Sequence, residues 1–181
     1  MRTCIAIAAL GVLAGGCRSL PEPDFSPAEP NLKVITYNVN WGFAQPQNVV
    51  EFLSKGDADV VCLQETHNRW EAVLKTHLAM TYPYSVFEDW PRAGGGIAVM
   101  SRYPLRNVRL LLAPAAGWFP AIRADIETPI GQIQLLNVHL KPPVTEEGLV
   151  TAAAYYTAPS VHLDELKVFL STVDTVGFSQ N

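Results

Sequence analysis

The sequence predicts one mixed α/β domain, and three features of the chain support this fold class. Strand-like apolar runs alternate with helical patterns over residues 33–78, which predicts a strand-helix-strand unit. Short strand-like runs separated by Gly or Pro follow over residues 96–139, which predicts an antiparallel meander. The chain has 181 residues, of which 49% are hydrophobic, so it is long enough to bury one substantial core.

The predicted strand-helix-strand unit begins with a β-rich strand over residues 33–40. Apolar residues at helical spacing predict a helix over residues 46–54, and Gly56 turns the chain into an apolar strand over 59–64. Both strands are expected to be buried and parallel. A second helix is expected over residues 68–78, again from the helical spacing of its apolar residues.

The second part of the chain is predicted to contain four short strands and a last helix. The strands are expected at residues 96–101, 106–112, 119–127 and 132–139. A hairpin turn at residues 128–131 is expected to join the last two strands. Ser160 is expected to cap the last helix, with Asp164 and Glu165 in its first turn.

The N-terminal residues 1–17 have the pattern of an export signal, with an apolar stretch too short to span a bilayer. Residues 13–17 resemble a bacterial lipobox, in which Cys17 is lipidated, and ordinary secretion with cleavage nearby is the alternative. A Pro-rich tether over residues 18–31 leads to the folded part, residues 32–181. We therefore expect a lipid-anchored protein of the bacterial cell envelope, held at the outer membrane or facing the periplasm.

Charge and cysteine content narrow the function classes. The formal net charge of −4 provides no basic field to concentrate nucleic-acid phosphates, so nonspecific nucleic-acid binding is disfavoured. Cys62 is the single cysteine beyond the export signal, so the folded part has no internal disulfide. Because Cys62 lies in an apolar strand, we interpret it as a core residue and not as a nucleophile or metal ligand.

Polar residues end three apolar strand runs, where enzyme sites commonly form. Glu65 offers carboxylate oxygens, which hard divalent cations prefer, and strand alternation points Gln64 to the other face. Asn38 provides an amide that can orient this carboxylate or contact a metal-bound water. His139 can donate a proton to a leaving oxygen, with Asn137 hydrogen-bonding beside it.

Each of these residues also has a structural interpretation that the sequence leaves open. Glu65 can serve as a helix cap, Asn38 as a turn amide and His139 as a buried structural histidine. The functional interpretation depends on the occurrence of all three at strand ends. Together they indicate a divalent-metal phosphoesterase.

The segments that carry these residues resemble the endonuclease/exonuclease/phosphatase superfamily. They are residues 34–40, 59–65, 94–104 and 137–140, in the order and at the spacing of that superfamily. The resemblance implies a DNase I-like four-layer α/β sandwich. It further implies that Glu65 binds Mg²⁺, with Mn²⁺ as the alternative, that Asn38 supports the metal site as metal contact and catalytic residue, and that His139 assists at the phosphate.

The sequence departs from the superfamily pattern in two motifs. A Gly-Asp-x-Asn segment and a later Asp-His pair are absent from it. The resemblance therefore implies an incomplete domain that lacks its second catalytic half and has little turnover.

Two function hypotheses follow. The first is an exported metal-dependent phosphoester hydrolase, inactive in this shortened form, whose substrate is a nucleic acid fragment, a phospholipid head group or a small phosphoester. The second is a noncatalytic exported binding module on the same scaffold.

Overall fold

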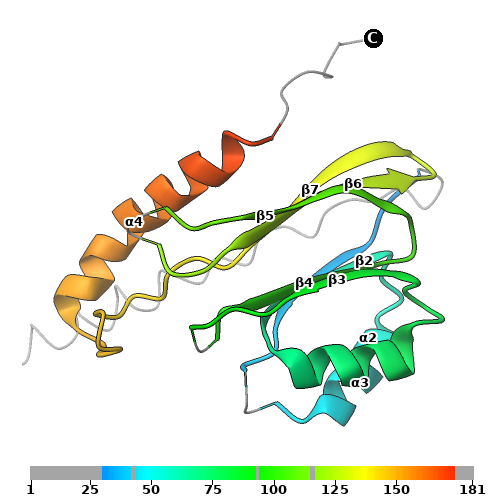
Figure 1. Ribbon diagram of the computed structural model, residues 1–181, viewed down its shortest axis with the longest axis horizontal. Coiled ribbons are helices and arrows are strands. Elements are labelled where there is room, and N and C mark those ends of the chain that lie inside the picture. The colour runs from blue at the N-terminus through cyan, green and yellow to red at the C-terminus, as the bar shows by residue number, and fades with distance from the viewer. Residues whose placement is uncertain (1–29, 42–43, 93, 115–116, 174–181) are drawn as a thin grey trace, which may run out of the picture. The chain divides into compact units, whose positions relative to one another are not determined.

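The computed structural model describes residues 30–41, 44–92, 94–114 and 117–173, and the fold lies within residues 31–173 (Figure 1). The export signal, Cys17 and the tether up to residue 29 fall outside the described residues and stay predictions. The described elements are β1 (Val34–Asn38), α2 (Pro46–Lys55), β2 (Val60–Thr66), α3 (Asn68–Leu78), β3 (Tyr84–Glu88), β4 (Gly96–Ser101), β5 (Leu105–Leu111), β6 (Ala121–Thr128), β7 (Gly131–Val138) and α4 (Ala152–Leu170).

The strands form two sheets that face each other (Figure 1). The first has the order β1-β2-β4-β3, in which β1 and β2 are parallel and the other neighbours are antiparallel. The second is the antiparallel meander β5-β6-β7. The predicted mixed α/β fold, with its strand-helix-strand unit, is confirmed.

Two apolar clusters hold these layers together. The first packs α2 and α3 on the outer face of the first sheet, where Leu53 and Leu74 meet Leu63 and Met100. The second fills the space between the sheets, and Cys62 belongs to it. Burial raises the pKa of the Cys62 thiol to about 12, so the thiol stays protonated at neutral pH, as expected of a core residue.

The predicted elements differ from the structure in the second half of the chain. β4 does not join the meander, because it pairs with β2 and β3 in the first sheet. β3 has no counterpart among the predicted strands. The meander prediction therefore holds only for β5, β6 and β7.

The prediction that Ser160 caps the last helix is wrong. The side chain of Thr151 accepts a hydrogen bond from the Ala154 backbone N–H at 3.1 Å, so α4 begins at Ala152, in an Ala-rich stretch that favours helix. The hydroxyl of Ser160 instead donates to the Thr157 carbonyl inside the helix. Glu165 lies in the second half of α4 and is fully buried, so it is not a first-turn residue.

α4 packs on the chain that follows β7. The carboxylate of Glu165 accepts the Lys141 backbone N–H at 3.1 and 3.3 Å, and the His162 ring lies 2.7 Å from the Lys141 carbonyl oxygen. Figure 1 shows α4 to one side of the sheets, apart from α2 and α3. Among the described residues, no helix combines the length and apolar composition needed to cross a lipid bilayer.

Candidate functional site

Parallel pairing of β1 and β2 brings Asn38 and Glu65 to one edge of the first sheet. Asn38 is in register with Gln64, the residue before Glu65. The Asn38 amide Nδ2 donates to Glu65 Oε1 at 2.7 Å, and Asn38 Oδ1 accepts the Asn40 backbone N–H at 2.8 Å. Asn38 therefore holds one carboxylate oxygen of Glu65 and is itself held by its own turn.

A β-bulge at Glu65 changes the direction of its side chain. The pairing of β2 with β4 shifts between Gln64 and Thr66, and Glu65 has a φ of 60°, a left-handed backbone rare for residues other than Gly. Regular alternation would point Glu65 opposite to Gln64, toward the helices. Instead both side chains reach toward the second sheet, since Gln64 contacts Asn137 and Glu65 approaches His139. The alternation predicted for this pair is therefore interrupted at the bulge.

Gly96 makes the bulge possible on the neighbouring strand. It is paired with Thr66, and a Cβ atom at Gly96 would lie 2.0 Å from the Thr66 carbonyl oxygen. A second glycine, Gly94, has a φ of 74° and lies beside the carboxylate, because a Cβ there would be 3.7 Å from Glu65 Cδ. The two glycines thus let the start of β4 approach the Thr66 backbone and the Glu65 carboxylate closely.

His139 follows β7 in the second sheet and completes the group. Its Nε2 lies 3.8 Å from Glu65 Oε1. The imidazole stacks on the Phe119 ring, with 4.2 Å between ring centroids and 7° between planes. Burial lowers the pKa of His139, while the Glu65 carboxylate and a hydrogen bond with the Gly94 backbone oppose this shift. The net result favours the neutral imidazole at neutral pH.

Asn137 does not join this group. It is buried between the sheets, where its Nδ2 donates to the Leu63 and Ala98 carbonyls at 3.1 and 2.9 Å. Its Oδ1 accepts from Gln64 Nε2 at 2.7 Å. Its amide donors and acceptor are all engaged, so this geometry gives Asn137 the role of joining the sheets and does not support a substrate contact.

The geometry supplies one feature that sequence reasoning missed, the aromatic support of the imidazole. Phe119 was expected inside a strand, whereas β6 begins at Ala121 and Phe119 precedes it. Periodicity treats an aromatic residue in an apolar run as core. Only the folded structure shows that its ring positions His139.

The donor set of the site suits a hard divalent cation in part. Glu65 provides carboxylate oxygens, of which Oε1 bonds Asn38, and its side chain is 24% exposed. The described part of the chain contains no group of three or more His, Cys, Asp or Glu arranged to hold a metal ion. Mg²⁺ is commonly bound by one or two carboxylates together with water and phosphate oxygens, so Glu65 fits a site of that kind.

Comparison with known proteins gives a family match. The model of the Endonuclease/Exonuclease/phosphatase family matches residues 35–163. No curated protein sequence matches the chain.

Several solved structures share the fold. Sphingomyelinase C from Streptomyces griseocarneus superposes with a TM-score of 0.61 and 21% identity, covering 79% of this chain and 59% of that one. An AP endonuclease from Archaeoglobus fulgidus superposes with a TM-score of 0.55 and 23% identity, covering 80% of this chain and 53% of that one. A variant of the 3′ phosphatase NExo from Neisseria, bound to a product DNA hairpin, superposes with a TM-score of 0.53 and 20% identity. The match covers 77% of this chain and 51% of that one. The chain thus spans about half to three fifths of the length of these structures.

Proposed function

Because this chain belongs to the endonuclease/exonuclease/phosphatase family, we propose that its site serves divalent-metal-dependent hydrolysis of a phosphoester. One observation carries the proposal: Asn38, Glu65 and His139 come from three distant strand ends and meet within hydrogen-bonding or ion-pairing distance. A bulge with left-handed backbone at Glu65 supports it further, since such strain is concentrated at functional sites.

Each residue has a proposed task that follows from its contacts. Glu65 is the proposed ligand for Mg²⁺, with Mn²⁺ as the alternative, and a bound divalent cation acts as a Lewis acid on a phosphoryl oxygen. Asn38 fixes Oε1 of Glu65 and so limits the rotation of the carboxylate. His139, neutral at neutral pH, is proposed to hydrogen-bond a phosphate oxygen through its ring N–H.

The substrate is proposed at the level of chemical class. The similar structures are named for different reactions, as a sphingomyelinase, an AP endonuclease and a 3′ phosphatase. A nucleic acid fragment, a phospholipid head group and a small phosphoester all contain the bond that this site is proposed to act on.

Mg²⁺ binding by the full chain tests the proposal most directly. We expect calorimetry to detect binding that Glu65→Gln weakens at least tenfold, because an amide replaces the anionic ligand. Glu51→Gln is the matched control, since Glu51 is an exposed carboxylate on α2 paired with Lys55. Equal Mg²⁺ affinity of the two variants would rule out Glu65 as the ligand.

Turnover is the second measurement. The Gly-Asp-x-Asn and Asp-His motifs are absent from the 181 residues, so we expect weak Mg²⁺-dependent hydrolysis of bis(p-nitrophenyl) phosphate. A longer form that carries both motifs should hydrolyse it readily and lose that activity with Glu65→Gln. Absence of hydrolysis by the longer form, with a partner affinity that Glu65→Gln leaves unchanged, would favour the noncatalytic binding module.

We also propose that the protein is exported and lipid-anchored through Cys17. The proposal rests on the sequence of residues 1–17. In bacteria fed a radiolabelled fatty acid, the wild-type chain should become labelled and fractionate with membranes. A Cys17→Ser variant that still incorporates the label would overturn the anchor.

A further inference from the structure

A carboxylate next to the candidate site is surrounded by cationic and N–H donors. Both oxygens of Glu146 lie 3.1 Å from Trp118 Nε1, and Lys141 Nζ donates to Glu146 Oε1 at 2.5 Å. An Arg92 guanidinium nitrogen lies 3.7 Å from Glu146 Oε2. We call Arg92, Trp118 and Lys141 the anion cage.

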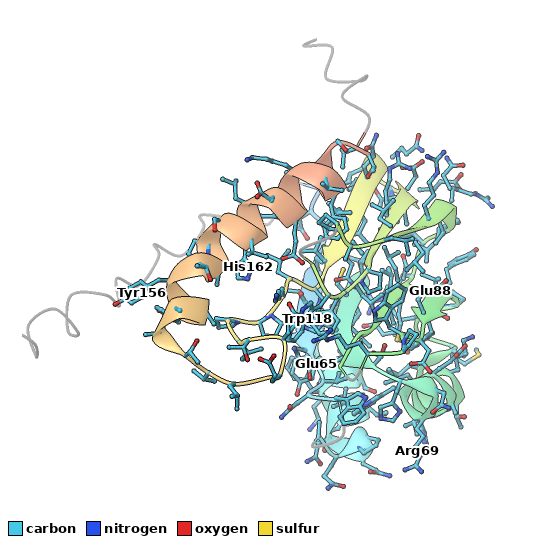
Figure 2. All side chains as sticks on the ribbon, turned by 60° about the vertical axis from the view of Figure 1, so that its left-hand side comes forward. Glu65, Arg69, Glu88, Trp118, Tyr156 and His162 are labelled. Carbon is cyan, nitrogen blue, oxygen red and sulfur yellow. The ribbon has the colours of Figure 1, made fainter. Side chains whose placement is uncertain are left out.

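The anion cage adjoins the proposed catalytic group along three segments. Arg92 precedes Gly94, Trp118 precedes Phe119, and Lys141 follows His139 by two residues. The Trp118 and Phe119 rings meet edge to face at 6.0 Å, and Phe119 stacks on His139. Figure 2 labels Trp118 of the cage and Glu65 of the candidate site.

The cage residues contact one another as well as the carboxylate they hold. The Arg92 guanidinium lies 3.3 Å from the Trp118 ring centroid and Lys141 Nζ 4.8 Å from it, so both cations rest over the indole. Trp90 Nε1 donates to the Trp118 carbonyl at 3.1 Å. The Lys141 side chain is only 16% exposed, whereas that of Glu146 is 64% exposed.

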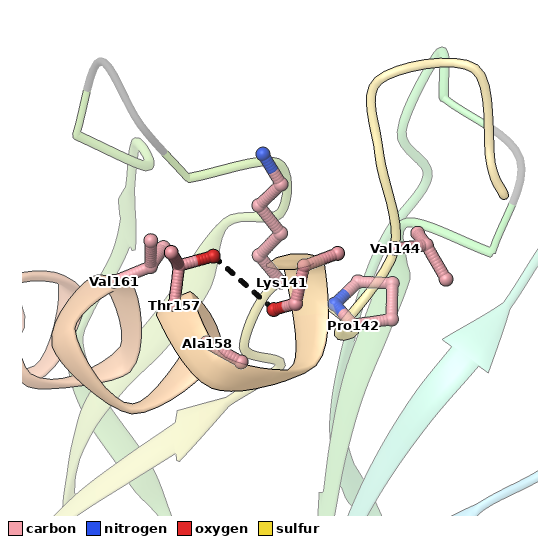
Figure 3. A pocket seen from close by; sticks show the side chains of 7 residues that line it. Lys141, Pro142, Val144, Thr157, Ala158 and Val161 are labelled. Carbon is pink, nitrogen blue, oxygen red and sulfur yellow. Dashed lines mark hydrogen bonds between the residues drawn. The ribbon is translucent and has the colours of Figure 1, made fainter. Parts of the chain in front are cut away.

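Lys141 is anchored by its backbone. Its N–H and carbonyl are held by Glu165 and His162 of α4. Lys141 also lines a small cavity of about 40 Å³ between α4 and residues 141–144, which precede it (Figure 3). Figure 3 shows the ammonium group extending away from this helix.

The Glu146 carboxylate therefore has the properties of a group that another anion can displace from the anion cage. It belongs to the exposed loop after Lys141, and it brings one carboxylate to donors held by other parts of the fold. Hydrogen bonds from Lys141 and then Trp118 lower the pKa of Glu146, so it is anionic at neutral pH. A phosphate group carries more charge and more acceptor oxygens than a carboxylate and matches Arg and Lys donors well.

We propose that the anion cage binds a second phosphate group of the substrate, and that Glu146 competes for the cage until this phosphate displaces it. Only the identification of this phosphate as part of a substrate rests on the proposed function. The anion site itself is inferred from the contacts of the cage residues. It favours phosphoesters with at least two phosphates. A quaternary ammonium head group is disfavoured, because Arg92 and Lys141 already place positive charge on the indole.

Pyrophosphate binding to the full chain in EDTA tests this inference without metal or turnover. We expect Arg92→Ala to weaken binding about tenfold, because one charge-assisted donor is lost. Glu146→Gln should tighten binding about fivefold, because the competing charge is removed. Phosphocholine should bind no variant measurably. Shifts of the Trp118 indole N–H signal in NMR spectra report binding at the cage itself.

Glu147→Gln is the matched control for Glu146→Gln. It removes the same charge from the same loop, and its neighbour Thr145 lies outside the cage. If both variants tighten pyrophosphate binding equally, or if Arg92→Ala binds like the wild type while its circular dichroism is unchanged, the cage only fastens the loop and the inference fails.

Glu65→Gln separates the two proposals. It should leave the pyrophosphate affinity within about twofold of the wild type, because Glu65 is not a cage residue. Unchanged Mg²⁺ binding in Glu65→Gln would overturn the proposed function alone. Unchanged pyrophosphate binding in Arg92→Ala would overturn the cage alone.

Discussion

Burial against Phe119 sets the protonation of His139, and this has a measurable effect on stability. The pKa of His139 in the folded chain lies below the ordinary value of 6.5. Between the two pKa values the unfolded chain binds more protons than the folded one, so the free energy of unfolding rises with pH there. The stabilisation is fully present above pH 6.5 and is lost as the pH falls through the lower, folded-state pKa.

Replacing the imidazole should remove this pH dependence. In metal-free protein, we expect His139→Asn to flatten the rise of the unfolding free energy with pH just below the ordinary histidine pKa, as measured by urea titration at several pH values. His77→Asn, on the exposed side of α3, is the control and should follow the wild-type curve. If the unfolding free energy of His139→Asn rose with pH as steeply as that of the wild type, His139 would not be the source of this pH dependence.

The sequence pointed to three candidate site residues because strand ends are visible as apolar runs followed by polar residues. Asn38, Glu65 and His139 were predicted in this way, and the structure brings their side chains together, at 2.7 Å between Asn38 and Glu65 and 3.8 Å between His139 and Glu65. The environment of Asn137 could not be found, because an amide one residue inside a strand end points either to solvent or to a second sheet. Only the stacking of the sheets decides between them.

At the scale of elements, the bulge in β2 depends on a glycine in β4. We expect Gly96→Ala to lower the free energy of unfolding by about 3 kcal/mol, because its Cβ would collide with the Thr66 backbone. Gly131→Ala meets no heavy atom within 4 Å and carries only the strain of its φ of 115°, which costs roughly 1–2 kcal/mol. Urea unfolding compares the two, and an equal loss would mean that the bulge adapts to a side chain.

Local patterns predicted the elements best where apolar residues recur at helical spacing or form an unbroken run. The helix over residues 68–78 coincides with α3, and the strand over 96–101 coincides with β4. α4 was placed too late because Ser160 is a good cap by residue type, whereas the helix continues through Pro159 from the cap at Thr151. β3 is a strand through its pairing with β4 and has a weak pattern of its own.

At the scale of the whole molecule, Asn137 joins the two sheets through one buried amide. We expect Asn137→Ala to lower the free energy of unfolding by about 2 kcal/mol, because Gln64 and two strand carbonyls lose their partner. Gln132→Ala, at an exposed position of the same strand, should change it by less than about 0.5 kcal/mol. Equal midpoints of urea unfolding for Asn137→Ala and Gln132→Ala would show that the Asn137 amide does not stabilise the contact between the sheets.

The mixed α/β class followed from the order of the patterns, but the division of strands between sheets did not. β4 and β5 are consecutive short strands separated by a Pro-containing turn, and neither pattern names the strand with which it pairs. β4 pairs with β2 and β3 because both of its faces are buried between the helices and the second sheet. This burial on both sides is a property of the assembled layers.

If Glu65 binds the proposed cation, its left-handed backbone in β2 makes folding independent of cation binding. Strand pairing and a neighbouring amide hold the acidic group of Glu65 in place through contacts within the chain. An arriving ion would find its ligand preorganised, unlike the ion of a zinc finger, which must assemble its own site. A chelator should therefore strip the ion while the far-ultraviolet spectrum of the protein stays the same.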